Sequence, residues 1–185
     1  AYTSKAAQPL TDGLAISAVK RIFRYLPIAY ENGDDDIARS EMAIAALEAG
    51  ICINNSSVTI VHAMSRPIGA LFHVPHGLSN AMLLCKCMEY AKDGAPERFA
   101  ELARAAGAAA ESNSDSEAAD KLVAGLFDIV KKCEVPTVEE YGIDKDAFAA
   151  AIPKMTADAL ASGSPGNTRK SVGAEDIAAI YKELI

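Results

Sequence analysis

All three histidines of this 185-residue chain fall within one 15-residue window. The window runs from His62 to His76, and His73 lies between them. Imidazole is the commonest metal ligand among side chains and the group most easily tuned for proton transfer near neutral pH. Neutral imidazoles bind a divalent metal at roughly 2.0–2.1 Å. We therefore expect this window to carry the chemistry of the chain.

The residues around the histidines predict two consecutive helices joined by a short reversal. A helix that begins near residues 55–56 leads to His62, and Pro67 and Gly69 are expected to end or kink it soon afterwards. His76 falls in the first turn of the next helix, where the helix dipole disfavours imidazolium and keeps the ring able to coordinate. The two histidines then lie on adjacent elements and can face one point.

The spacing alone leaves a structural alternative open. Two histidines fourteen residues apart can equally be packing or capping residues, and periodicity cannot separate these roles. The concentration of all the histidines in one window favours the functional reading without deciding it.

Composition and charge exclude several classes of function. The chain has 18 positive and 25 negative residues, a net charge of −7, and no basic stripe, so a nucleic-acid partner is not expected. It has no tryptophan, no signal peptide, and no apolar run of roughly 18 residues. Its four cysteines lie in apolar stretches, as buried free thiols do in a reducing compartment. We therefore expect a cytoplasmic protein without a membrane partner.

Helical periodicity extends along nearly the whole chain, without strand alternation. Leu14, Ala18, Ile22 and Leu26 form one apolar face of a helix that Pro27 and the Asn32-Gly33 pair are expected to close. The acidic triplet Asp34-Asp35-Asp36 is expected at the positive end of the next helix dipole rather than at a cation site. The prediction is one all-α domain of about eight helices, with further helices over 34–50, 55–66, 76–92, from Pro96, 116–132, 144–160 and 174–184.

The histidine window also resembles a known family signature. His62-Ala63-Met64, Pro67-Ile68-Gly69, His73-Val74-Pro75-His76-Gly77 and Asn80-Ala81 are similar to the signature of the iron-containing (group III) alcohol dehydrogenases. In that family a helical C-terminal domain, of the kind also seen in dehydroquinate synthases, follows an N-terminal nucleotide-binding domain, and the metal lies between them. The similarity extends over most of the chain, including Pro9-Leu10-Thr11-Asp12, Ala38-Arg39-Ser40-Glu41-Met42, Ala49-Gly50, Asn54-Asn55, Gly166-Asn167-Thr168-Arg169 and Glu175-Asp176-Ile177.

The resemblance implies a role for several residues of the window. His62 and His76 match the two metal-binding histidines of the helical domain, for iron(II) with zinc as the alternative. His73 matches a position at the cleft, which implies a substrate-side or proton-relay role or else a polar cleft wall. Arg66 replaces a second histidine of many members, so a proton relay there is in doubt, and the arginine instead tunes substrate charge preference. Phe72 is expected in the core.

For the whole enzyme, the resemblance implies reversible conversion of an alcohol to its aldehyde or ketone by hydride transfer to NAD or NADP. The partner would be a small-molecule alcohol or carbonyl compound, and a homodimer is one assembly that the chain allows. Two alternatives stay open. One is a metal-assisted lyase of the same superfold, and the other is a stand-alone helical metal-binding or interaction module.

Two metal ligands of that family are missing from the chain. The family supplies an aspartate and a histidine in a D-x-x-x-H turn, normally followed within a few residues by a segment like E-A-Y-x-S, whereas this chain opens with Ala1-Tyr2-Thr3-Ser4. No glycine-rich dinucleotide motif is present either. We therefore expect residues 1–185 to be the C-terminal metal-binding helical domain of a longer enzyme, with the N-terminal nucleotide-binding domain absent. Alone, it should be inactive and hold metal weakly.

Overall fold

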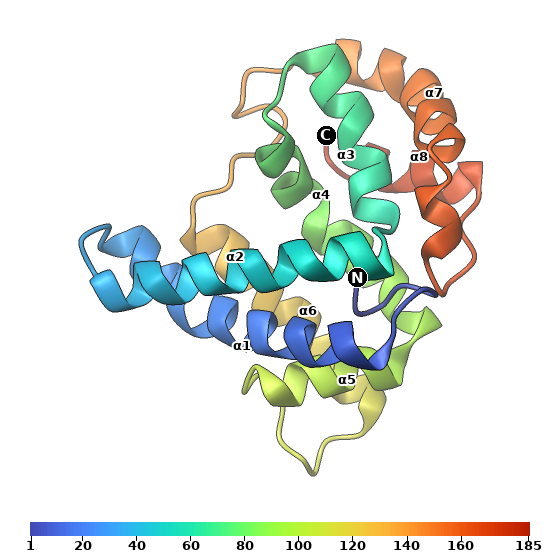
Figure 1. Cartoon of the computed structure of the whole chain (residues 1–185). Coiled ribbons are helices and arrows are strands. Elements are labelled where there is room, and N and C mark those ends of the chain that lie inside the picture. Colours follow the sequence, from blue (N-terminus) through green and yellow to red (C-terminus); the bar gives the residue numbers. More distant parts are fainter.

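The computed structural model describes residues 1–185 as eight α-helices and two short 3₁₀-helices, without a β-strand (Figure 1). An isolated antiparallel bridge joins Ser4 to Thr168. The all-α prediction with about eight helices is confirmed. The elements are α1 (Pro9–Glu31), α2 (Asp36–Ser56), α3 (Ile60–Phe72), α4 (His76–Ala91), η1 (Lys92–Gly94), α5 (Pro96–Ala105), α6 (Asp115–Lys132), α7 (Lys145–Ala161), η2 (Ser164–Asn167) and α8 (Ala174–Lys182).

The first two helices are longer than predicted and lie side by side as a hairpin (Figure 1). Pro27 does not close α1, which continues to Glu31. The helix ends at Asn32, as the Asn32-Gly33 pair predicted, and the backbone N–H of Asn32 donates to the carbonyl of Ile28 at 2.8 Å. Likewise α2 continues past Gly50 to Ser56. Extensive packing between the two helices outweighs the local preference of proline and glycine to end a helix.

The acidic triplet lies at the start of α2, as expected. The Asp35 side chain accepts a hydrogen bond from the backbone N–H of Ala38 at 2.8 Å, and Asp36 lies in the first turn. These carboxylates therefore cap the helix and interact with the positive end of its dipole.

The core consists of two hydrophobic clusters. The larger one is formed mainly by α3, α4, α7 and α8, and Phe148 and Tyr181 are its largest fully buried side chains. The smaller one lies between α1, α5 and α6 and contains Phe99. Met88 of α4 packs against both clusters, so α4 joins the two parts of the molecule.

Pro67 and Gly69 are predicted to end or kink the third helix soon after His62, and the expected end is wrong. Both residues lie inside α3, which begins at Ile60 and runs to Phe72. Pro67 removes the hydrogen bond to the carbonyl of Ala63, but Pro67 itself is buried, and most of the apolar residues of α3 belong to the larger cluster. This burial offsets the local cost of the proline. His62 therefore lies near the beginning of its helix rather than near the end.

No individual helix combines the length and apolar character needed to cross a bilayer. Only α2 and α3 taken together, across a bend of 103°, meet these requirements by length and composition. All four cysteines are free; Cys52, Cys85 and Cys87 are buried, as predicted, and Cys133 is half-buried.

Tyr181 anchors α8 to α3 in the larger cluster. Its hydroxyl donates a hydrogen bond to the buried carbonyl oxygen of Met64 at 2.6 Å, and its ring packs edge-on against Phe148. We predict that Tyr181→Phe lowers the free energy of unfolding by about 1 kcal/mol, because one buried hydrogen bond is lost with little change of shape. Urea denaturation followed by circular dichroism measures the change. Tyr141→Phe, at an exposed tyrosine, is the matched control, and equal midpoints for the two variants would contradict the prediction.

Candidate metal centre

The structure brings the imidazoles of His62 and His76 together. Their ring centroids are 5.3 Å apart, and the ring planes are inclined by 60°. His62 lies in the first turn of α3, and His76 is the first residue of α4. Two imidazoles bound to one tetrahedral metal at about 2.0–2.1 Å place their centroids roughly 5 Å apart. The observed separation therefore fits a shared divalent metal.

The reversal between α3 and α4 sets this proximity. His73 ends α3 in the left-handed conformation, with φ of 56°, Val74 is buried in the larger cluster, and Pro75 precedes the first turn of α4. A Cβ atom at Gly69 would lie 3.1 Å from the carbonyl oxygen of Val74. The glycine thus lets the connecting segment fold back closely against α3, which carries His76 toward His62.

A second junction fixes the start of α3. Ser57 adopts a positive φ of 61° between α2 and α3, and the chain bends there by 103°. The side-chain amide of Asn167 donates to the Ser57 hydroxyl at 2.9 Å and to the Val58 carbonyl at 3.0 Å. Sequence reasoning placed Asn167 in a family-like motif but gave it no role. Residues 110 positions apart carry no local signal of their contact.

The environment keeps the His62 ring neutral. His62 is half-buried, and burial lowers its pKa below the ordinary value. The neighbouring His76 ring and the Arg66 guanidinium lower this pKa further. A neutral imidazole offers a lone pair to a metal, which an imidazolium cannot do. The site therefore favours coordination over proton storage at His62.

The two histidines are a partial donor set. The structure contains no group of three or more histidine, cysteine, aspartate or glutamate side chains arranged to hold a metal. Two imidazoles supply half of the four donors that a tetrahedral metal needs. The pair therefore fits a metal that also takes donors from outside these residues.

Asn80 is a further member of the site. Its amide nitrogen lies 3.1 Å from Nε2 of His76, one turn away on α4, while its Oδ1 is buried without a hydrogen-bond partner. Asn80 and His62 line a shared pocket of about 400 Å³, which Ile53 of α2 also lines. Sequence reasoning included Asn80 in the family-like motif without assigning it a role. Its four-residue spacing from His76 is the signal that predicts this contact.

The other residues of the window have distinct positions. His73 is exposed on the connecting segment, three residues before His76. Arg66 is exposed one turn after His62 on α3 and forms no ion pair within 4 Å. Phe72 stacks on Phe148 with ring centroids 5.5 Å apart, which confirms its expected place in the core.

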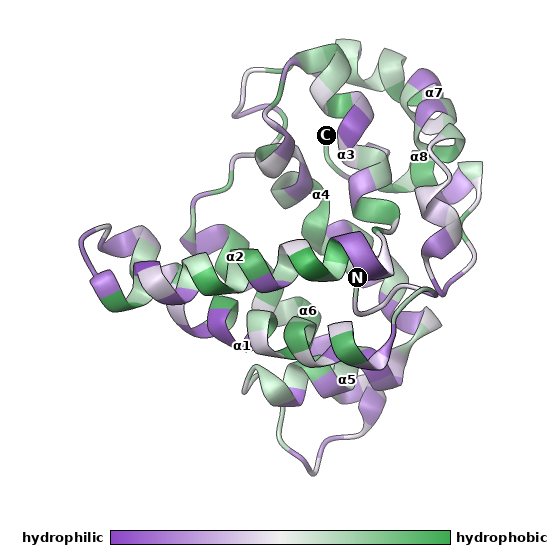
Figure 2. Cartoon of the chain, in the orientation of Figure 1, coloured by the Kyte–Doolittle hydropathy of each residue, from purple (hydrophilic) through white to green (hydrophobic).

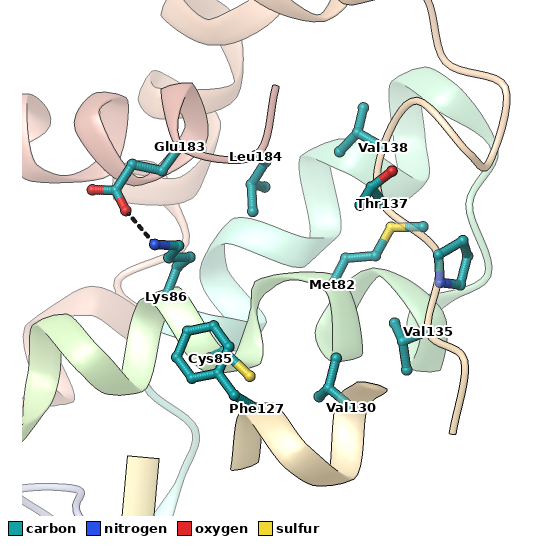
Figure 3. Close-up of a pocket in the computed structure, with 11 residues that line it drawn as sticks. Met82, Cys85, Lys86, Phe127, Val130, Val135, Thr137, Val138, Glu183 and Leu184 are labelled. Atoms are coloured by element: carbon teal, nitrogen blue, oxygen red, sulfur yellow. Dashed lines mark ion pairs between the residues drawn. The ribbon is translucent and has the colours of Figure 1, made fainter. Parts of the chain in front are cut away.

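A separate cavity lies away from the histidines (Figure 3). It has a volume of about 180 Å³, lies between α4, α6 and the C-terminal residues, and is lined mainly by apolar side chains. The ion pair between Lys86 and Glu183, at 2.9 Å, lies at its edge. Burial raises the pKa of Cys85 to about 11, so this thiol stays protonated.

Comparison with known proteins agrees with the predicted resemblance. The family model described as Fe-containing alcohol dehydrogenase family, C-terminal, matches residues 1–185. A choline dehydrogenase of Bacillus subtilis (strain 168) is 37% identical over 164 residues, which cover 89% of this chain and 41% of that protein. A 1,3-propanediol dehydrogenase of Klebsiella pneumoniae is 34% identical over 184 residues, covering 99% of this chain and 46% of that protein.

The solved structures give the same result. The crystal structure of a 1,3-propanediol oxidoreductase matches the fold with a TM-score of 0.93 and 32% sequence identity. The match covers 100% of this chain and 47% of that chain. The chain thus spans less than half the length of these relatives. It belongs to the Fe-containing alcohol dehydrogenase family and corresponds to the C-terminal part of its members.

Proposed function

We propose that this chain is the C-terminal, metal-binding half of an alcohol dehydrogenase that interconverts an alcohol and its aldehyde or ketone with NAD or NADP. The observation that carries the proposal is the adjacent pair of imidazoles, His62 and His76, in a chain of this family. The relatives of this chain include enzymes described as alcohol dehydrogenases, such as the bifunctional aldehyde-alcohol dehydrogenase of Escherichia coli (strain K12).

In this proposal, His62 and His76 hold iron(II), with zinc as the alternative, because imidazole suits both metals. A bound divalent metal would act as a Lewis acid on the alcohol oxygen, and the nicotinamide would accept the hydride. Burial of His62 favours its neutral ring, which keeps a nitrogen lone pair available to a metal. The remaining metal donors and the nucleotide site belong to the part of the relatives that this chain does not span.

We assign His73 a proton-relay or substrate-side role. A histidine in the left-handed conformation costs stability that a glycine at the same helix end would not cost. Strain of this kind concentrates at functional sites. The side chain of His73 is exposed to solvent, three residues before His76 in the sequence.

The proposal also covers the partners, the cellular location and the assembly of the enzyme. A net charge of −7 without a basic stripe supports a small-molecule substrate and no nucleic-acid partner. Free buried thiols support a cytoplasmic location without membrane attachment. A homodimer is part of the same proposal.

The metal assignment is tested in the full-length enzyme by His62→Ala and His76→Ala. Each variant should lose most of its bound iron or zinc, together with its dehydrogenase activity, because one of the few donors is removed. Elemental analysis of the purified proteins and steady-state kinetics measure the two effects. Arg39→Ala, at an exposed residue of α2, is the control and should keep both. Activity that survives in either histidine variant with unaltered metal content would reject the ligand assignment.

The role of His73 is tested by His73→Gly in the same enzyme. This variant should raise the unfolding temperature, because glycine tolerates the positive φ. It should also lower kcat by about 100-fold, a typical loss when a proton-transferring group is removed. Metal content should remain unchanged. A variant with unaltered kcat and pH profile would assign His73 to the cleft wall instead.

The reaction class is tested by a substrate screen. The full-length enzyme with NAD or NADP and a series of primary and secondary alcohols should produce reduced nicotinamide, detected by its absorbance. Removal of the metal with a chelator should abolish the signal, and adding the metal back should restore it. Substrate consumption without net nicotinamide reduction would favour the metal-assisted lyase. Absence of both activities in the full-length protein would favour a binding module.

A further inference from the structure

The cavity between α4 and α6 is a hollow that the side chains of this chain leave unfilled. Its volume is about 180 Å³. The middle turns of α4, over residues 81–85, are hydrophobic (Figure 2) and supply one wall. The apolar lining includes the following residues (Figure 3): Met82, Phe127, Val130, Val135, Val138 and Leu184. Protein interiors are close-packed and leave few voids larger than a water molecule. A hollow of this size is therefore more than imperfect packing.

The lining of the cavity favours an apolar guest over ordered water. A buried water molecule needs two to four polar partners. Cys85 contributes a buried, protonated thiol, which is only a weak donor. The hydroxyl oxygen of Thr137 already accepts a hydrogen bond from the backbone N–H of Glu140 at 3.2 Å. Few polar groups thus remain for water, and an apolar molecule would replace it at little cost.

The charges at the edge of the cavity are already neutralised. Lys86 and Glu183 are the two charged residues of the lining, and they pair with each other at 2.9 Å. The ammonium group of Lys86 also lies 3.5 Å from Glu89 and 5.9 Å from the centroid of the Phe127 ring. Neither an anion nor a cation would find a free counter-charge here. The guest that fits the lining is therefore uncharged.

The same ion pair borders a second hollow. Lys86 and Glu183 also line a polar hollow of about 320 Å³, together with Tyr90 and Asp176. The pair thus lies between the apolar cavity and this polar hollow. Both side chains are partly exposed, and exposed ion pairs are held weakly and change rotamer rapidly. Opening of the pair would widen the entrance without disturbing the hydrophobic core.

We propose that the cavity between α4 and α6 binds a small uncharged organic molecule with a mainly apolar body, about the size of benzene. An apolar protein cavity of about 150 Å³ stays dry and takes benzene or xenon, so the size of this one is sufficient. The cavity is separate from the imidazole pair, because no histidine lines it. Binding there requires neither the metal nor the nicotinamide, and the inference goes beyond the proposed function.

The experiment measures the binding of benzene and of benzoate to the full-length enzyme by ligand-observed NMR. Benzene should bind saturably, and benzoate at least about tenfold more weakly, because its carboxylate finds no unpaired positive charge. Val130→Phe places a ring in the cavity and should weaken benzene binding by at least about tenfold, since the guest loses its buried apolar contacts. Ile28→Phe adds the same ring on α1, outside the cavity, and should keep the wild-type affinity.

Xenon locates the guest directly and does not depend on a variant that folds. Crystals of the wild-type enzyme under xenon pressure should contain a xenon atom between Met82 and Val130. Absence of saturable benzene binding, or of xenon from this cavity, would overturn the proposal. Equal affinities of the wild type and a folded Val130→Phe would also overturn it, as would benzoate that binds as tightly as benzene. Metal content and nicotinamide reduction, measured on the same samples, report on the proposed function separately.

Discussion

The packing of α3 into the larger hydrophobic cluster is the constraint on which the candidate site depends. Ile60, Met64 and Ile68 are fully buried on one side of this helix, which fixes its position and rotation. His62 occupies the opposite side of the same first turns, so the core determines where its ring points. The burial is strong enough to hold the helix intact through Pro67. Stability and ligand geometry are thus set by the same contacts.

Both imidazoles of the candidate metal centre lie at the beginning of a helix rather than in its middle. His62 lies in the first turn of α3, and His76 opens α4. Burial disfavours a charged ring at His62, and the neighbouring His76 ring acts in the same direction. A metal that binds His62 therefore meets little competition from protons for this nitrogen. Rigid helices also hold ligands more precisely than loops do.

The sequence predicted the helical class, the approximate helix number and the proximity of His62 to His76, because these follow from periodicity and from a short connection. It correctly ended the first helix at the Asn32-Gly33 pair, but the breaks expected at Pro27, Gly50 and Pro67 do not end their helices, since tertiary packing there overrides local preference. The role of Asn167 could not be predicted. Its partners lie more than one hundred residues earlier, and no local pattern encodes such a contact.

The contact of Asn167 with the α2–α3 junction has a consequence for the biosynthesis of the protein. The hydrogen bonds that fix the start of α3, like the one from Tyr181 to Met64, join residues to partners that are synthesised more than one hundred positions later. A nascent chain that has not yet reached Asn167 and Tyr181 lacks both restraints. The start of α3, which carries His62, is then held less firmly. The hydrogen bonds that restrain α3 are therefore complete only after Tyr181 has been synthesised.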